Sequence, residues 1–445
     1  MSSINNESTR RTFLKTSAIA GAALAAPALV SRPAGAADDE TIRLGLVGCG
    51  GRGTGAVFDA FRSSANVKIV AMADLVPERL NSSRQNIKKD WGEKGNYAVT
   101  DDNCFLGVDA YKQLCAHPDV DVVIHTTPPG LRHLTLREAV KNGKHSFVEK
   151  PACVDPFSYG HVIESGRQAD EKGLAIVSGT QYRRENSYRE AIKRLQDGVI
   201  GDIVGGFAYY CTGTLWLNGT ETDWNKWGGF DGTEYQMRNW LYFSWLSGDH
   251  IAEQAVHNLD AINWGFGGPP ASAYGSGGRL VRRGRKYGNI YDHFSIDYDY
   301  PSGARVSFKC RQVNGAEGRV ENRFVGTKGT LDIVPQPGNS TAIIRDTKGK
   351  IMWAHDGRAG NNAPYVQEHT DLIASIRAGQ PIQEIQEVAD SSLTAVIGRE
   401  AAYSGQEVAF DWAANKSQLK LSPDSITVAS YPVREVPRPG TYKLV

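Results

Sequence analysis

Short apolar runs alternate with amphipathic stretches along the first part of the chain. The strand-like runs lie at 41–47, 67–73, 120–124, 146–148 and 175–177. The helical patterns between them lie near 77–88, 134–142 and 155–172. Runs that are apolar throughout are typical of parallel strands buried on both faces, and their alternation with helices is typical of a doubly wound sheet. We therefore predict an α/β domain over residues 41–182.

After residue 182 the pattern changes to longer strand-like runs separated by Gly- and Trp-rich loops. These strand-like runs lie at 203–210, 293–300, 305–313, 323–325, 330–333 and 342–345. Two late helical patterns lie near 366–378 and 388–404. Such runs with few helices are typical of an antiparallel sheet with one covered face. Residues 183–445 therefore predict an α+β domain with a large, mainly antiparallel open sheet.

The first 36 residues have the features of an export signal. Arg10 and Arg11 precede Phe-Leu-Lys, an Ala-rich apolar run follows over 18–30, and Ala34-Gly35-Ala36 provides small residues for cleavage. We predict a twin-arginine signal peptide over residues 1–36, and hence a periplasmic or otherwise exported protein. The alternative is a basic, Ala-rich helix of the mature domain, which explains neither the arginine pair nor the small residues.

Composition narrows the classes of partner. The 50 Lys and Arg balance 49 Asp and Glu, so the net charge of +1 favours neither nucleic acid nor an anionic membrane as a partner. The six cysteines are scattered and include no Cys-x-x-Cys pair. A chain of 445 residues needs no disulfide staples, so we expect mostly free thiols.

A glycine motif supplies the first chemical signal. Gly48-x-Gly50-x-x-Gly53 ends the first strand and opens a helix, and Asp74 ends the second strand about 20 residues later. Glycines there let the backbone approach a pyrophosphate, and the carboxylate can bind the ribose hydroxyls while repelling a 2′-phosphate. The pattern predicts a Rossmann domain that binds NAD rather than NADP; the alternative is a plain turn followed by a solvated Asp.

Further motifs resemble the Gfo/Idh/MocA oxidoreductase family. They are Pro129 followed by His133, Gly143-Lys144-His145, Glu149-Lys150-Pro151, and residues 324–331 in the second half. The resemblance covers most of the chain after the signal. It implies that Lys150 lies beside the nicotinamide and the reacting hydroxyl, where a cation would stabilise developing negative charge. With the glycine motif, it gives these expected cofactor-binding residues: Gly48, Gly50, Gly51, Arg52, Gly53, Asp74, His133, Glu149, Lys150 and Pro151.

A second signature lies in residues 248–260. Family members commonly carry Asp-x-x-x-His-x-x-Asp on a helix that faces the nicotinamide; here Glu253, His257 and Asp260 take those positions, with Glu replacing the first Asp. Residues 253 and 257 would lie one helical turn apart and reach the same substrate. Since an imidazole titrates near neutral pH, His257 suits proton transfer. The expected catalytic residues are Lys150, His257 and Glu253.

Other interpretations of these residues remain open. His250, Glu253 and His257 share a helix face and could bind a metal, but the resemblance needs none and we predict none. His257 could instead be a hydrogen-bonded core residue. Trp245 is as well explained by a core or subunit-interface role as by sugar binding, and Glu368, His369 and Asp371 are expected to be solvated or supporting.

Sugar rings stack on aromatic faces, while Arg and Asn donate to hydroxyl groups. The residues expected to line the substrate site are Tyr182, Arg183, Arg238, Asn239, Trp240 and Asp260. The resemblance implies an NAD-dependent oxidoreductase that acts on a secondary hydroxyl of a sugar, polyol or glycoside. Twin-arginine export moves folded protein to a compartment where free NAD is not expected, so we predict that the cofactor is tightly held and recycled. The alternatives are an NAD-dependent glycoside hydrolase that uses transient oxidation and elimination, and a non-catalytic cofactor-containing binding protein. The expected partners are a small carbohydrate and further copies of the chain, joined through the second sheet.

Overall fold

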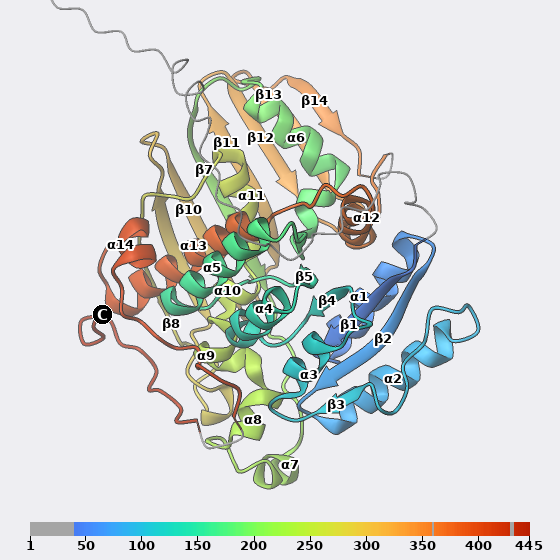
Figure 1. Cartoon of the computed structure of the whole chain (residues 1–445). Helices are drawn as coiled ribbons and strands as arrows, with labels where there is room; N and C mark the ends of the chain where they lie inside the picture. Colours follow the sequence, from blue (N-terminus) through green and yellow to red (C-terminus); the bar gives the residue numbers. More distant parts are fainter. Residues whose placement is uncertain (1–39, 358–359, 428–430) are drawn as a thin grey trace, which may run out of the picture. The chain divides into compact units, whose positions relative to one another are not determined.

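The computed structural model describes residues 40–357, 360–427 and 431–445 (Figure 1). The predicted signal peptide lies outside these residues. Within the described part of the chain, no helix is both long and apolar enough to cross a membrane.

The first half forms a six-stranded sheet in which every pair is parallel, in the order β3-β2-β1-β4-β5-β6. Its strands are β1 Ile42–Val47, β2 Val67–Asp74, β3 Cys104–Leu106, β4 Val122–His125, β5 His145–Val148 and β6 Ile176–Ser178. This is the strand order of the doubly wound dinucleotide-binding fold, so the α/β prediction is confirmed. Sequence reasoning missed β3, which has only three residues and no fully buried position.

Helices cover this sheet. They are α1 Gly51–Ser63, α2 Pro77–Trp91, α3 Ala110–Ala116, η1 Pro129–Leu131, α4 Arg132–Lys141 and α5 Pro156–Glu171. A late helix, α12 (Pro364–Arg377), also packs on α1 and on β6. Glu368 and His369 on α12 are consequently buried and not solvated, whereas Glu368 contacts Arg52 of the cavity lining, the supporting position that was the other expectation. The reason is long-range docking, because a helix that joins the first domain from the chain's end buries a face that looks polar in sequence.

The second sheet has nine strands in the order β14-β13-β12-β11-β7-β10-β9-β8-β15. Their bounds are β7 Ile203–Thr212, β8 Ser272–Gly278, β9 His293–Asp299, β10 Arg305–Gln312, β11 Arg319–Gly326, β12 Gly329–Val334, β13 Thr341–Asp346, β14 Ile351–His355 and β15 Val408–Ala409. Only the β7–β10 pair among these is parallel, which confirms a mainly antiparallel sheet. The strand β8 escaped prediction because three of its seven residues are glycine, a residue depleted in strands.

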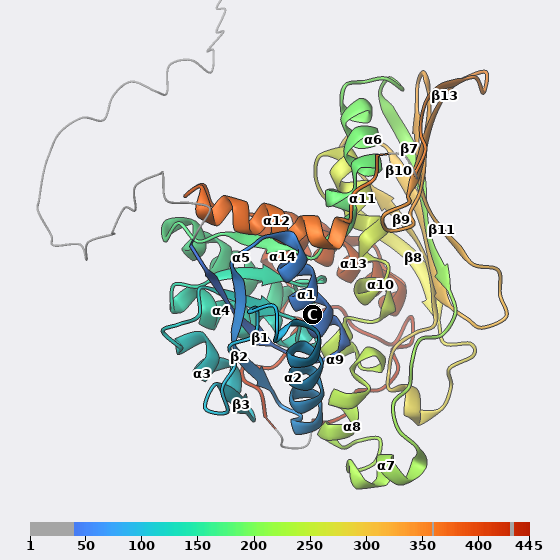
Figure 2. The same ribbon diagram turned by 90° about the vertical axis from the view of Figure 1, so that its right-hand side faces the viewer.

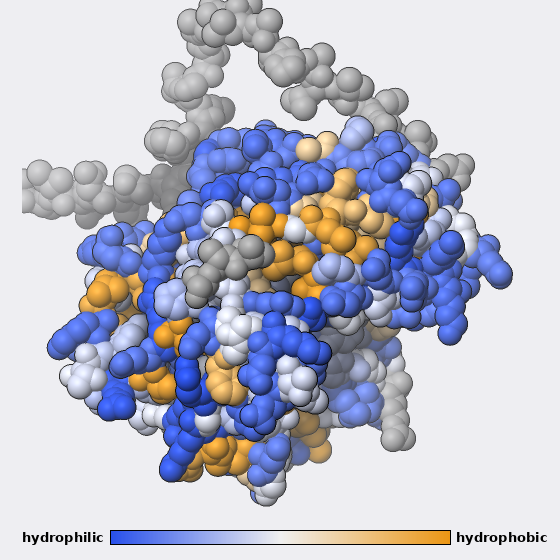
Figure 3. Space-filling view, turned by 90° about the horizontal axis from the view of Figure 1, so that it is seen from below, coloured by the Kyte–Doolittle hydropathy of each residue, from blue (hydrophilic) through white to orange (hydrophobic). Residues whose placement is uncertain are grey.

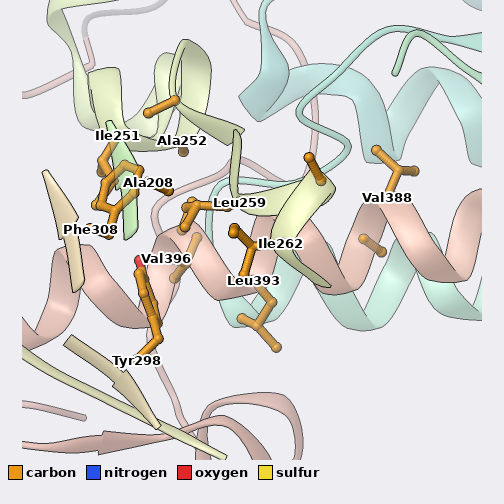
Figure 4. Packing of buried hydrophobic residues seen from close by; sticks show 14 of the residues in the cluster. Ala208, Ile251, Ala252, Leu259, Ile262, Tyr298, Phe308, Val388, Leu393 and Val396 are labelled. Carbon is orange, nitrogen blue, oxygen red and sulfur yellow. The ribbon is translucent and has the colours of Figure 1, made fainter. Parts of the chain in front are cut away.

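Helices cover one face of this sheet, as the edge-on view shows (Figure 2). The helices of the second half are η2 Gln181–Arg184, α6 Asn186–Gln196, α7 Glu221–Lys226, α8 Thr233–Arg238, η3 Trp240–Tyr242, α9 Ser244–Ser247, α10 His250–Glu253, α11 Val256–Phe266, η4 Arg285–Tyr287, α13 Ile385–Ser404 and α14 Phe410–Asn415. The central helix is α13, which is buried at every residue from Leu393 to Ser404. Figure 4 shows Leu393 and Val396 on α13 among Leu259, Ile262 and Tyr298.

The packing around α13 gives a test of stability. A Cβ at Gly398 would lie 2.1 Å from the hydroxyl of Tyr298, which is fully buried and has little room to move. Gly398→Ala should therefore cost about 1–3 kcal/mol of overpacking, more than the ~0.5–1 kcal/mol that Ala normally adds in a helix. Urea unfolding should show a lower free energy of unfolding.

The matched control is Gly160→Ala in α5, where a Cβ would meet no atom within 4 Å. It should raise the free energy of unfolding by about 0.5–1 kcal/mol. Equal effects of the two substitutions would contradict this packing.

Candidate active site

One large cavity lies where the carboxyl ends of the parallel strands face the second half of the chain. Its volume is about 1390 Å³, above the ~300–1,000 Å³ usual for ligand pockets. It is lined from both halves, by the glycine loop, Asp74, Glu149 and Lys150 on one side and by Glu253 and His257 on the other. Ligands of open α/β sheets bind at this edge, so the cavity is the candidate active site.

The glycine loop fits a pyrophosphate. A Cβ on Gly53 would lie 2.1 Å from the carbonyl oxygen of Gly48, so only glycine allows the turn and the helix to pack this closely. Gly50 and Gly51 have no atom within 4 Å of a Cβ position and leave the first turn of α1 open to the cavity. Beside them, the guanidinium of Arg52 is held by the carboxylates of Glu149 and Glu368. Open amides at a helix N-terminus suit an anionic bridge.

Asp74 is placed to bind a ribose. It ends β2 and lines the cavity, and its two carboxylate oxygens accept hydrogen bonds from the amides of Cys49 (2.6 Å) and Val76 (2.8 Å). Burial raises the pKa of Asp74, although these amides oppose the shift. Arg79 lines the same wall and interacts electrostatically with Asp74. The sequence analysis did not predict a cation at this position.

The structure brings together the three expected catalytic residues. Nζ of Lys150 donates to the main-chain carbonyl of Glu253 (2.7 Å) and lies 3.3 Å from its Oε1. His257 lines the cavity with both residues, and its ring lies 5.3 Å from that of Tyr182. Glu253 and His257 do not share one helix, however. The helix is interrupted between α10 and α11 at residues 254–255, so the prediction that both residues lie on one helix is wrong.

The surroundings keep the His257 imidazole neutral. Burial lowers the pKa of His257 well below its usual value, and the charges of Lys150 and Arg52 lower it further. Its Nδ1 is shielded from the cavity and has no hydrogen-bond partner among the described residues. A neutral imidazole that lines the same cavity as an ammonium group can accept a proton from a hydroxyl through its other nitrogen, Nε2, while the ammonium holds the oxygen.

A buried charge cluster supports the lysine. Arg52 binds Glu149 through Nε and contacts Asp59 and Glu368, and Glu149 Oε2 accepts from the main-chain amide of Lys150 (3.1 Å). Glu368 is completely buried, and burial raises its pKa well above the usual value. Arg52 thus connects the glycine loop to the Glu149-Lys150 turn.

The remaining predicted residues divide into two groups. Tyr182 and Trp240 line the cavity. Six others lie outside its lining: His133, Pro151, Arg183, Arg238, Asn239 and Asp260.

Most of these six have partners elsewhere. Arg183 and Asp260 form a two-pronged ion pair, with both N–O distances 2.8 Å. His133 is buried, with Nε2 on the carbonyl of Pro423 (2.9 Å). Asn239 accepts from the amide of Asn218 (2.7 Å), and Arg238 contacts Glu234 and Glu78.

His250 does not face the cavity. It is buried between Asp249 (2.9 Å) and the thiol of Cys310 (3.5 Å), so it does not join Glu253 and His257 as a ligand set. Across the described residues, no group of three or more His, Cys, Asp or Glu side chains is arranged to hold a metal ion. All six cysteines are free, as expected.

Sequence reasoning missed several cavity residues. These include Thr126, Thr127, Tyr210, Trp216, Gln254 and Tyr365. Thr126 and Thr127 directly follow β4, and the rule that ligands bind at strand carboxyl ends could have indicated them. Tyr365 belongs to α12, over 200 residues beyond the Glu-Lys-Pro motif, and carries no local signal.

Comparison with known proteins agrees with this fold. A family model described as "Oxidoreductase family, NAD-binding Rossmann fold" matches residues 42–179, and one described as "GFO/IDH/MocA C-terminal domain" matches residues 188–332. The first sheet and the glycine loop therefore define an NAD-binding oxidoreductase. The chain belongs to the Gfo/Idh/MocA family.

Two curated relatives are similar over part of their length. The 2,7-anhydro-N-acetylneuraminate hydratase of Escherichia coli is 25% identical over 54% of this chain and 65% of its own. A glycosyl hydrolase family 109 protein of Shewanella amazonensis is 27% identical over 39% of this chain and 36% of its own. This chain thus spans less than two thirds of either relative.

Solved structures share the fold at low identity. The aldose-aldose oxidoreductase of Caulobacter crescentus complexed with glycerol has a TM-score of 0.65 and 18% identity, covering 83% of this chain and 99% of that one. The WlbA dehydrogenase of Bordetella pertussis in complex with NADH and UDP-GlcNAcA has a TM-score of 0.60 and 19% identity, covering 83% and 98%.

The position of Asp74 predicts cofactor choice. Asp74→Ser should weaken NAD binding about 10- to 100-fold, the value of a charged hydrogen bond, and improve NADP binding because Arg79 then faces a 2′-phosphate unopposed. Titration of both dinucleotides by calorimetry measures this. Asp74→Asn, which removes the charge at constant size, should relax discrimination in the same direction. A wild-type preference for NADP would show that Asp74 does not bind the ribose.

The electrostatics of His257 predict its titration. The charge of Lys150 disfavours the imidazolium, so Lys150→Met should raise the pKa of His257 towards its ordinary value. Imidazole NMR without substrate measures this, with His257→Gln to assign the signal. The control is Lys144→Met, because Lys144 lies outside the cavity lining and should leave this pKa unchanged. An unchanged His257 pKa in Lys150→Met would contradict the arrangement.

Proposed function

We propose that this protein oxidises a secondary hydroxyl of a sugar, polyol or glycoside and retains and recycles its NAD. The observation that carries this is that Lys150 and the neutral His257 line one cavity with the glycine loop and Asp74, where the charge of Lys150 acts on the imidazole. NAD, when bound, would accept a hydride from the carbon that bears the hydroxyl. Only this chain's own groups are then needed to bind the oxygen and remove its proton.

Each residue has a distinct task in this proposal. The Lys150 ammonium donates to the substrate oxygen and stabilises the negative charge that develops as hydride leaves. His257 accepts the hydroxyl proton, for which its lowered pKa keeps it ready. Glu253 holds Lys150 through a carboxylate and a carbonyl, and Tyr182 and Trp240 offer faces on which a sugar ring can lie.

The named relatives bear on the fate of the cofactor. Hydration and glycoside hydrolysis, the reactions in the names of the two relatives, involve no net oxidation. An NAD-binding protein that performs either reaction must return its hydride within the same turnover. This favours a recycled cofactor here, and it keeps an NAD-dependent glycoside hydrolase as the second candidate.

Two further proposals concern the protein's setting. We propose export through the twin-arginine pathway, on the basis of the residues of segment 1–36. Detection of the mature protein in a periplasmic fraction would test this.

We also propose a homo-oligomer through the uncovered face of the second sheet. There Phe207, Tyr274 and Val334 are 41–58% exposed although their neighbours Ala208, Ala273 and Ile333 are buried. Light scattering would measure the oligomer.

The proposed chemistry predicts the effect of removing its two polar groups. Lys150→Ala and His257→Ala should fold, keep NAD and lose about 10²–10⁴-fold in kcat, the usual value of acid–base assistance. A screen of glycans and monosaccharides that scores both cofactor reduction and product mass supplies the substrate. In a single turnover, an oxidoreductase should leave reduced cofactor, whereas a glycosidase should return unaided to oxidised NAD with a cleaved glycoside.

The control for this test is Lys144→Ala, which removes a lysine outside the cavity lining and should keep full activity. Full activity in both site variants would remove Lys150 and His257 from the mechanism. Loss of folding in either one would instead support a structural role.

A further inference from the structure

The position of Asp74 fixes where the adenosine half of NAD must lie. In this fold an acidic residue at the end of the second strand binds the ribose next to adenine. The cavity continues past Asp74 along the residues Leu75, Gly107, Ala110 and Tyr111. In an isolated nucleotide-binding domain this end of the cleft would be open to solvent.

Here a segment of the second half closes it. Residues 213–247, which we name the cover, leave β7 and contain α7, α8, η3 and α9. Five of its apolar residues line the same cavity: Leu215, Trp216, Met237, Trp240 and Leu241. Figure 2 shows α8 beside the lower end of α2, and Figure 3 views the molecule from the end where α7 and α8 lie and shows apolar residues there among polar ones.

The cover is joined to the nucleotide-binding domain. Arg238 lies 3.3 Å from the carboxylate of Glu78, and Arg79 donates to the carbonyl of Arg238 (3.5 Å), both at the start of α2. Met237 and Leu241 belong to one buried apolar cluster with Tyr111 of α3. The contacts therefore flank the adenosine end on both sides.

The chain's last segment lies across the cover. The ring of Tyr431 stacks on Trp245 at 4.0 Å, and its amide donates to Thr233 (3.0 Å). Its hydroxyl donates to the carbonyl of Leu421 (2.7 Å), and the amide of Ser422 is bound by the buried Asp155 (2.6 Å). Tyr431 and Ser422, which do not line the cavity, thus hold the cover in place.

We propose that the cover is an adenosine-binding wall that retains NAD, so that the dinucleotide leaves only when residues 213–247 separate from α2 and α3. The proposal depends on the proposed function only in its explanation of why NAD is retained, since an enzyme that recycles its cofactor has no need to exchange it. The ligand chemistry is an adenine ring against the apolar side chains of the cover that line the cavity, with the ribose on Asp74.

The test is the rate at which NAD leaves the purified protein after dilution, without any sugar. Free NAD is counted at intervals in an ultrafiltrate by an enzymatic cycling assay. Tyr431→Ala removes the stacking on Trp245 and should speed release about tenfold. Arg238→Ala should speed it about two- to fivefold, the value of a partly exposed ion pair. Neither residue lines the cavity, so a faster release would come from the cover and not from a lost cofactor contact.

Two controls separate this from general damage. Tyr431→Phe keeps the stacking and loses only the hydrogen bond to Leu421, so it should release NAD more slowly than Tyr431→Ala. Arg285→Ala breaks an exposed ion pair between Arg285 and Asp231 of the cover, away from α2, and should leave the rate unchanged. Circular dichroism confirms that each variant folds.

The outcomes distinguish the two proposals. Equally slow release from wild type, Tyr431→Ala and Arg238→Ala would contradict the proposed role of the cover, while the proposal that NAD is retained would stand. Release within seconds from wild type would overturn both retention and the cover. The sugar chemistry would then still be tested separately, with added NAD, through Lys150 and His257.

Discussion

The contact between Lys150 and Glu253 is the constraint on which the site depends. Lys150 follows β5 of the first sheet, and Glu253 ends α10 beneath the second, so their hydrogen bonds join the two halves at the cavity. An ammonium group with only 12% of its side chain exposed needs such partners, because a largely buried charge without them is costly. Its charge in turn contributes to keeping His257 neutral. The contact with Glu253 therefore fixes the position of the ammonium group and, through its charge, affects the proton affinity of His257.

The charge cluster extends this constraint to the cofactor loop. Arg52 stands in the first turn of α1, where the loop amides face the cavity, and it also holds Glu149, the neighbour of Lys150. The raised pKa of Glu368 favours its neutral form, which lessens the repulsion among the three carboxyl groups around one guanidinium. Anion binding at the loop and lysine placement are therefore connected through one arginine.

Local spacing predicted those features that local geometry creates. The glycine turn and the Glu-Lys-Pro turn each follow a strand, and Asp74 ends one, so their place at one sheet edge could be derived from the order of elements. The break between α10 and α11 could not, because Glu253 and His257 keep a spacing that also fits an unbroken helix. Burial of Glu368 and closure by the cover depend on helices and loops that meet the first domain from far along the chain. Arg183 and Asp260 show the same limit, since side chains that suit a sugar can equally satisfy each other.

The central claim is that NAD stays in the cavity beside Lys150 and His257 and is not exchanged during turnover. Denaturing the purified protein and quantifying NAD in the supernatant tests this most directly, because the measurement needs no substrate. The account predicts close to one NAD per chain. Protein that purifies without NAD and binds added NAD only weakly would contradict it.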